Sequence, residues 1–291
     1  METALSIARF LHYSAAIQLF GTAVFETWIA SKALSSSLLA TSRRIAVFNA
    51  WLLFASAVLW LAFEAGNMGN GWADVLNPSV ISLVFTATSF GKVWIGNMAL
   101  AAVAVIVTHV LGPRKWAALA VVSTLCLGDL AFIGHAVADT GALGLLSQTS
   151  QVVHLLSSGF WFGSLLSLVL VLRQIRDPRY ALDTDIALRR FSGLGHLAVA
   201  LALGSGLANS WFVLRDSPLS FTSTYQLLLA IKIVLVGMMC VLALVNRYVF
   251  VPMIPTGDPA AKKLRDGTVA ELIIGTIVVA LVSVIGLLSP S

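Results

Sequence analysis

The chain has 291 residues, of which 58% are hydrophobic and only 11% are charged, with a mean hydropathy of +0.93. A soluble domain usually has about 25% charged residues, so this composition excludes an ordinary soluble protein and indicates an integral membrane protein. The net charge of +5 is not evidence of nucleic-acid binding, because the basic residues are concentrated in short segments between apolar stretches.

Apolar stretches long enough to cross a bilayer follow one another along the chain. A bilayer core of roughly 30 Å requires about 20 apolar residues per helix, and backbone groups in lipid must be satisfied within the helix. The predicted fold class is therefore all-α, a polytopic membrane bundle of eight transmembrane helices. The predicted spans are Ile7–Ser31, Ile45–Asn67, Gly91–Leu111, Trp116–His135, Gln148–Leu172, Phe191–Leu214, Tyr225–Arg247 and Val269–Leu288.

The connections between these spans differ in charge. The odd-numbered connections hold most of the Lys and Arg residues, whereas the even-numbered connections hold Lys92 and Arg215. Lys and Arg are retained on the cytoplasmic side of a membrane, so we expect both termini to be periplasmic. We expect one transmembrane domain over residues 1–291, with an external loop and short interfacial helix at 68–90 and a cytoplasmic connector at 173–190.

Polar side chains inside the predicted spans are the candidates for function, because ionisable groups in a membrane are costly. Sorted by depth at about 1.5 Å per residue, they form an outer and an inner set. The outer set is His12, Glu64, Met68, Met98, Asp129, His135 and His154, with Lys232 in the outer half of its span. The inner set is Glu26, His109, His196 and Glu271.

The outer set combines imidazoles, thioethers and carboxylates. Imidazole and thioether ligands favour copper, and Met in particular favours Cu(I). Carboxylates alone would indicate Ca²⁺, Mg²⁺ or protons, and histidines without Met would leave zinc or haem equally open. A membrane His can also simply hydrogen-bond a neighbouring helix, and Met98 can serve as packing. Cys126 and Cys240 lie in apolar spans with no disulfide pattern.

An ordered series of short motifs resembles the CopD family of bacterial copper-resistance membrane proteins. The series covers nearly the whole chain and is more specific than any one of its pieces. It comprises Glu64-Ala65-Gly66-Asn67-Met68-Gly69, Thr88-Ser89-Phe90-Gly91-Lys92-Val93-Trp94, Gly134-His135-Ala136, Val153-His154-Leu155-Leu156-Ser157-Ser158-Gly159-Phe160-Trp161-Phe162-Gly163, Arg190-Phe191-Ser192, Ser205-Gly206-Leu207-Ala208-Asn209 and Tyr225-Gln226-Leu227-Leu228-Leu229, with Lys232, Asn246 and Glu271.

The resemblance implies a multi-pass protein of the bacterial inner membrane that moves copper ions from periplasm to cytoplasm, beside a separate periplasmic copper chaperone. It implicates His135, His154 and Met68 as metal ligands. It also implies structural or pathway roles for Trp161, Asn209, Lys232, Asn246 and Glu271. Asn97 departs from the family pattern, in which we expect Arg, so a charge is missing beside Met98.

Copper transport is therefore the leading hypothesis, with His135, His154 and Met68 capturing copper and His12 and Met98 lying deeper. One alternative is a haem-binding electron carrier that uses two of His12, His135 and His154. Another is a non-transporting membrane partner of a periplasmic copper protein, with residues 68–90 as its contact surface. We expect no enzyme, no ATP-driven pump and no nucleic-acid partner, because no catalytic motif or Walker motif is present.

Overall fold

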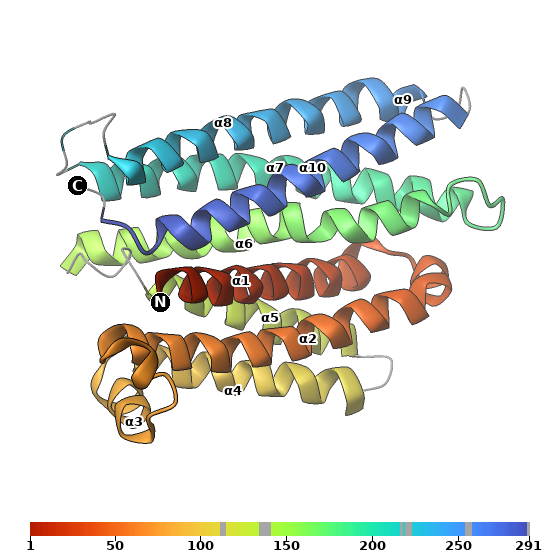
Figure 1. The fold of residues 1–291 in the computed structure, drawn as a ribbon. Helices are drawn as coiled ribbons and strands as arrows, with labels where there is room; N and C mark the ends of the chain where they lie inside the picture. The colour runs from red at the N-terminus through yellow and green to blue at the C-terminus, as the bar shows by residue number, and fades with distance from the viewer. Residues whose placement is uncertain (111–114, 134–140, 216–217, 219–222, 254–257, 290–291) are drawn as a thin grey trace.

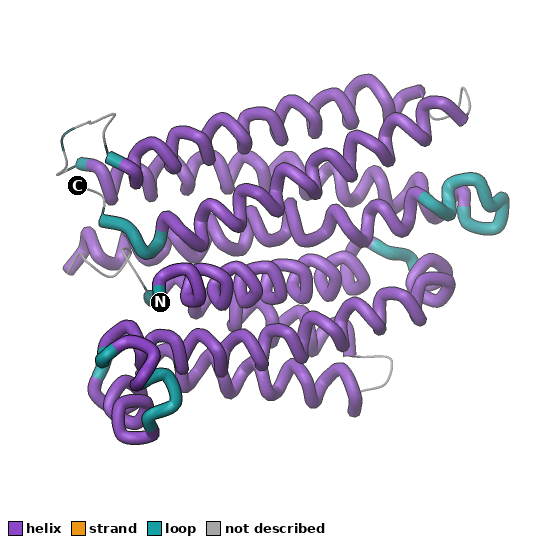
Figure 2. The backbone as a smooth tube through the Cα atoms, viewed as in Figure 1, coloured by secondary structure: helices purple, strands orange, loops and turns teal. Residues whose placement is uncertain are grey.

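A computed structural model describes the chain except residues 111–114, 134–140, 216–217, 219–222, 254–257 and 290–291. Within the described residues every regular element is helical (Figures 1 and 2). The elements are α1 (Glu2–Val24), η1 (Phe25–Ile29), α2 (Lys32–Met68), η2 (Gly71–Ala73), α3 (Pro78–Ala87), α4 (Ser89–Val110), α5 (Lys115–Asp129), η3 (Leu130–Phe132), α6 (Gly141–Leu172), α7 (Ala181–Leu214), α8 (Thr224–Val245), η5 (Asn246–Phe250), α9 (Val251–Met253) and α10 (Asp258–Ile285).

The long helices lie side by side in one bundle, with α1 at its centre (Figure 1). Helix α1 packs against α2 and α5 on one side and against α6 and α10 on the other. We call α2, α4 and α5 the N-terminal half, and α6, α7, α8 and α10 the C-terminal half. Because α1 contacts both halves, about half of its side chains are buried, His12 among them.

Seven of the described helices are long and apolar enough to span a membrane: α2, α4, α5 with η3, α6, α7, α8 with its continuation to Met253, and α10. Their outward faces carry large exposed apolar side chains, such as Leu207 on α7 and Val234 on α8. These features make the chain a multi-pass helical membrane protein. The predicted number of eight spans also includes α1, which is not among these seven.

Three helices begin at least ten residues earlier than the sequence predicted. The segment from Lys32 to Arg44 was expected to be a loop but forms the first turns of α2, where the Ser31 hydroxyl caps the helix by accepting a hydrogen bond from the Leu34 amide. Residues 181–190 of the expected connector belong to α7, and α10 starts at Asp258 rather than Val269. Hydropathy detects only the part of a helix that lies in lipid, so charged first turns were mistaken for loops.

The segment 68–90 contains η2 and α3, and Met68 is the last residue of α2 rather than a loop residue. Asp74 holds this connection together. Its carboxylate accepts hydrogen bonds from the Asn70 backbone amide at 2.7 Å and from the Asn77 side chain at 2.8 Å. These hydrogen bonds lower the pKa of Asp74 below its usual range.

The two halves of the bundle meet where α1 crosses α6. A side chain added at Gly21 would collide with the backbone of Gly163, and one added at Gly163 would collide with the Ile17 carbonyl. The Ser164 hydroxyl donates a hydrogen bond to the Gly21 carbonyl at 3.2 Å at the same crossing. Small residues allow this close approach of helices in membranes.

We predict that Gly21→Ala destabilises the protein, because the new methyl group meets backbone atoms that cannot move aside. Overpacking of this kind typically costs about 1–3 kcal/mol. The measurement is thermal unfolding of purified protein in detergent. Gly193→Ala on α7 is the matched control, because nothing lies within 4 Å of the added atom. Equal unfolding temperatures for the two variants would contradict this account of the crossing.

Candidate functional site

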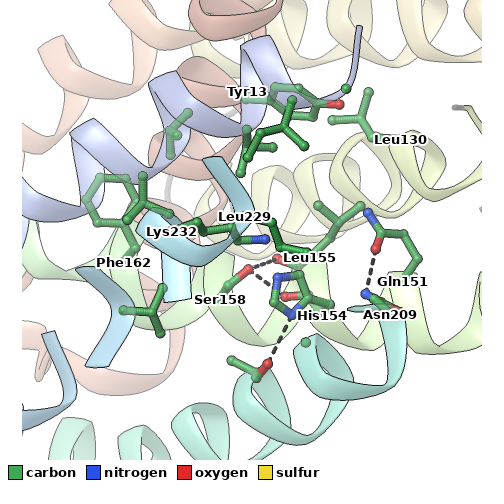
Figure 3. Close-up of a pocket in the computed structure, with 18 of the residues that line it drawn as sticks. Tyr13, Leu130, Gln151, His154, Leu155, Ser158, Phe162, Asn209, Leu229 and Lys232 are labelled. Atoms are coloured by element: carbon green, nitrogen blue, oxygen red, sulfur yellow. Dashed lines mark hydrogen bonds between the residues drawn. The ribbon is translucent and has the colours of Figure 1, made fainter. Parts of the chain in front are cut away.

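A cavity of about 260 Å³ lies between α1, α6, α7, α8 and α10, and we call it the outer cavity because it contains His154 of the predicted outer set. Its polar lining residues come from four of these five helices (Figure 3). They are Arg9 and Tyr13 on α1, Ser147, Gln151, His154 and Ser158 on α6, Asn209 and Ser210 on α7, and Tyr225 and Lys232 on α8. The predicted residues His154, Asn209, Trp161 and Lys232 thus share one cavity.

Hydrogen bonds to α7 fix the orientation of the α6 side chains in the outer cavity. The His154 ring places Nδ1 at 3.0 Å from the Ala202 carbonyl, which can only accept, so Nδ1 carries the proton. Neutral His154 therefore keeps its Nε2 lone pair for a ligand. One turn away, Asn209 Nδ2 donates to Gln151 Oε1 at 2.6 Å.

Lys232 gives the outer cavity a positive charge. It is half-buried two turns inside α8, and its ammonium group points toward Ser158 and His154 (Figure 3). A Lys at the centre of a transmembrane helix costs about 2.5–3.5 kcal/mol on insertion. A Lys occupies such a position where its charge has a function, which agrees with the choice of Lys232 as a candidate from the sequence.

A second, inner cavity of about 370 Å³ lies between α6, α7, α8 and α10. Trp161 is buried and lines both cavities. The inner cavity holds the predicted residues His196, Asn246 and Glu271, together with Cys240. Asn246 Nδ2 donates to Glu271 Oε1 at 2.6 Å, and His196 Nε2 is hydrogen-bonded to the Tyr248 hydroxyl at 3.0 Å.

Both cavities lie between α7 and α8. In the described residues α7 packs on α6 and α8 packs on α10, without an extensive interface between α7 and α8. These two helices are also the least buried candidate spans, with 17% and 11% of their most apolar windows buried. Helices α6 and α10 therefore close one side of the cavities, and α7 and α8, which face lipid, flank them.

The N-terminal half holds His12 in a separate, enclosed cluster. His12 is fully buried between the rings of Trp60 and Trp94, with ring centroids 5.6 Å and 5.1 Å away. Ser56 donates its hydroxyl hydrogen to the Leu53 carbonyl, so it accepts from His12 Nδ1 at 3.1 Å. His12 Nε2 has no hydrogen-bond partner in the described chain.

Asn97 and Asp129 lie beside His12 in this cluster. Asn97 Nδ2 donates to the Cys126 carbonyl at 3.2 Å, and Asn97 interacts with both His12 and Asp129. Asn97 Oδ1 and one oxygen of Asp129 find no hydrogen-bond partner among the described residues. Met98 is partly buried and packs on the apolar core of this half. This side of α1 therefore holds buried polar atoms that have no hydrogen-bond partner in the described chain.

Both π-helical segments carry a buried polar residue at the inner end of the bundle. In η1, Glu26 accepts hydrogen bonds from Ser35 at 2.6 Å and Ser42 at 2.5 Å. In η5, Asn246 reaches Glu271. Short π-helical segments are frequent at functional sites, because the extra residue re-aims a side chain.

The remaining predicted residues are scattered. Met68 is 50% exposed at the end of α2, Glu64 is half-buried near Arg9, and His135 lies outside the described residues. Within the described chain no three His, Cys, Asp or Glu side chains are grouped so that they would hold a metal ion. The structure therefore does not join His12, His154 and Met68 into one site.

Sequence reasoning missed Arg9 and Gln151, which both line the outer cavity. Each lies three residues before a selected histidine, His12 or His154. Residues three apart share a helix face, so this spacing was a usable signal. Arg9 lies near the start of the first predicted span, where a basic residue usually reaches the interface, so its position alone does not point to a cavity.

Long apolar helices that enclose cavities with several polar side chains define a multi-pass membrane protein. The chain matches the family model described as "Copper resistance protein D-like, N-terminal domain" over residues 1–145 and that described as "Copper resistance protein D" over residues 186–285. The chain belongs to the copper resistance protein D family. The stretch between the two matches includes His154 and Trp161.

Three relatives agree with this assignment. The chain is 34% identical over 284 residues to Inner membrane protein YebZ of Escherichia coli strain K12, covering 97% of both chains. It is 30% identical to Copper resistance protein D of Pseudomonas syringae pv. tomato, covering 100% of this chain and 98% of that protein. It is also 30% identical over 246 residues to Copper transport protein CutJ of Bacillus subtilis strain 168, covering 82% of this chain and 45% of that protein. No solved structure matches. The chain is a multi-pass inner-membrane protein.

We predict that Asn246→Ala destabilises the protein by about 1–3 kcal/mol, because Glu271 loses a buried donor. Thermal unfolding in detergent measures the effect. Thr276→Ala on α10 is the control, since the exposed Thr276 hydroxyl donates only to Leu272 of its own helix. An Asn246→Ala protein that unfolds at the wild-type temperature would show that this pair does not stabilise the inner cavity.

Proposed function

We propose that this protein moves copper ions across the inner membrane, from the periplasm to the cytoplasm. One observation carries the proposal: two cavities meet at Trp161 and together follow α6 from Ser147 to Leu168. At 1.5 Å per residue this stretch is about 30 Å long, which matches the hydrocarbon core of a bilayer. Family membership and the name of the relative CutJ support copper as the substrate.

We further propose that α1 is an eighth span and that both termini are periplasmic. With 23 residues α1 is about 34 Å long, and it lies parallel to its neighbours inside the bundle. Its mean apolarity is modest because polar residues such as His12 and Gln18 face other helices and not lipid. The start of α2, the turn between α6 and α7 and the start of α10 lie at the end of the bundle opposite the N-terminus (Figure 1). These segments contain Lys32, Arg176 and Lys262, as retention of positive charge in the cytoplasm requires.

Copper would pass a series of single ligands and not one tight site. His154 Nε2 is available in the outer cavity, and Cys240, His196 and Glu271 line the inner one. Imidazole and thiol groups suit copper. Conduction requires sites that bind weakly enough to release the ion, which agrees with the absence of a three-residue cluster in the described chain. The membrane potential favours cation uptake by about 2.3 kcal/mol per charge per 100 mV, so no enzymatic step is needed.

The charge of the outer cavity restricts the form in which copper enters. Lys232 and Arg9 both line it and would repel a bare copper cation. We therefore propose that copper enters as a complex whose ligands carry negative charge, delivered by a periplasmic copper-binding partner. The segment 68–90, with the exposed Met68 and Trp72, is the proposed contact surface for that partner.

The haem alternative gains no support from the described residues. Two axial histidines must face each other across a porphyrin. His12 is enclosed by Trp60 and Trp94 and does not line the cavity that contains His154. The alternative of a non-transporting partner of a periplasmic copper protein is distinguished by flux: purified protein in liposomes should carry copper inward, and a scaffold would not.

We predict that His154→Ala and Glu271→Gln each lower cellular copper accumulation severalfold, because each removes a ligand or charge from the proposed path. Accumulation is measured by mass spectrometry of metal in cells, with membrane protein levels matched. The control is His109→Ala, since exposed His109 bonds within its own helix and lines neither cavity. His135→Ala belongs in the same series as a test of the predicted external ligand. Unchanged accumulation in His154→Ala and Glu271→Gln would refute the path.

We predict that a reporter fused to the C-terminus faces the periplasm. Alkaline phosphatase, which folds only outside the cytoplasm, should be active at that position, and green fluorescent protein should be dark. Reporters placed after Gln174, in the turn between α6 and α7, should give the opposite pattern. A fluorescent C-terminal fusion would reverse the proposed orientation.

A further inference from the structure

We infer that the outer cavity is a binding site for an oxyanion, a phosphate or carboxylate group held by Lys232 and Arg9. This inference goes beyond copper transport and does not depend on it. The cavity receives two cationic side chains from two helices, Lys232 from α8 and Arg9 from α1. Among its described lining residues there is no Asp or Glu to balance them.

Neither cation is neutralised within the cavity. Lys232 forms no hydrogen bond or ion pair with the described part of the chain, although its charge acts on nearby His154. Arg9 lies over the Trp60 ring, 4.9 Å from its centroid, and its Nε has no hydrogen-bond partner there. Glu64 interacts with Arg9 from α2 but does not line the cavity. A bound anion would supply the missing counter-charge.

Neutral donors complete the polar end of the cavity. Because Asn209 donates to Gln151 Oε1, the amide of Gln151 is fixed with its NH₂ group as the remaining donor. The Arg9 guanidinium group lies against Gly286, where an added side-chain carbon would collide with it. Glycine at this position therefore leaves the space that Arg9 occupies. A guanidinium fork together with an ammonium group suits phosphate and carboxylate oxygens.

The location of the cavity allows two sources for this oxyanion. The cavity lies between α7 and α8, which face lipid and do not form an extensive interface in the described residues. Its deeper end is apolar, with Phe162, Val236 and Met239. An anionic phospholipid would place its phosphate beside Lys232 and Arg9 and its chain against this apolar end. Free phosphate would reach the same cations from the periplasm.

A basic side chain near a helix end can also extend its charged group to the interface without binding any ligand. Lys232 lies two turns inside α8 and lines the cavity. Arg9 lies near a helix end, but it lines the same cavity from another helix and its guanidinium group is wedged against Gly286. The convergence of the two cations therefore favours a site over independent positioning.

The test measures anion binding to the full-length, copper-free protein in neutral detergent. Native mass spectrometry counts bound phosphatidylglycerol against zwitterionic phosphatidylethanolamine, and equilibrium dialysis with labelled inorganic phosphate measures the soluble source. We expect wild type to bind one of the two anions, with affinity at least tenfold lower in Lys232→Met and in Arg9→Met. Lys92→Met is the control, since exposed Lys92 at the start of α4 lines neither cavity.

A second pair of variants keeps every charge. Gly286→Ala displaces Arg9 and should weaken anion binding, whereas Gly237→Ala on α8 meets nothing within 4 Å and should not. Binding of phosphatidylglycerol alone identifies a lipid site, and binding of inorganic phosphate identifies a soluble one. No binding of either anion, or equal binding by wild type and Lys232→Met, would overturn the inference. Because copper is absent, failure here and failure of copper transport are separate results.

Discussion

The close crossing of α1 and α6 determines how the rest of the molecule is arranged. At Gly21 and Gly163 the two backbones touch, and this contact seats α1 between the N-terminal and C-terminal halves. Helix α1 then presents Arg9 and Tyr13 to the outer cavity and His12 to the enclosed cluster with Trp60 and Trp94. A bulkier pair at the crossing would move α1 away from α6 and separate both groups of side chains from their partners. Gly21 and Gly163 therefore determine the position of side chains in two polar environments, which lie on opposite sides of α1.

The fold class followed from the sequence, because lipid permits few backbone structures and the apolar stretches are long. Helix ends did not follow from it. The first turns of α2 and α7 carry Lys32, Asp183 and Arg189, and a charged turn outside the lipid has the same composition as a loop. The site was predicted residue by residue but not as an assembly. Depth placed His12 and His154 at one level, yet they lie in different halves of the bundle, because depth carries no information on which helices are neighbours.

The surroundings of the buried polar groups differ between the two halves of the bundle. In the N-terminal half His12, Asn97 and Asp129 are enclosed by aromatic rings and packed helices, and several of their atoms lack partners in the described chain. Unsatisfied buried polar atoms are costly, so this cluster is retained for a purpose or is completed by water. In the C-terminal half the polar groups line cavities, and two of the helices around these cavities, α7 and α8, are the least buried spans. Rearrangement costs least where packing is sparse, so the C-terminal half is the part of the bundle suited to passage of a substrate.

The charges of the lining residues differ between the two cavities. The outer cavity has Lys232 and Arg9 without a lining carboxylate in the described residues, whereas the inner cavity is lined by both Glu271 and Arg247, and Trp161 lines the two cavities. On the proposed path, a bare cation from the periplasm would meet two positive charges first and the Glu271 carboxylate last. A copper complex with anionic ligands would be attracted first and would then meet a carboxylate that competes with its ligands for the metal. The proposed function therefore requires an exchange near Trp161, where copper would leave an incoming anion and pass to Cys240, His196 and Glu271.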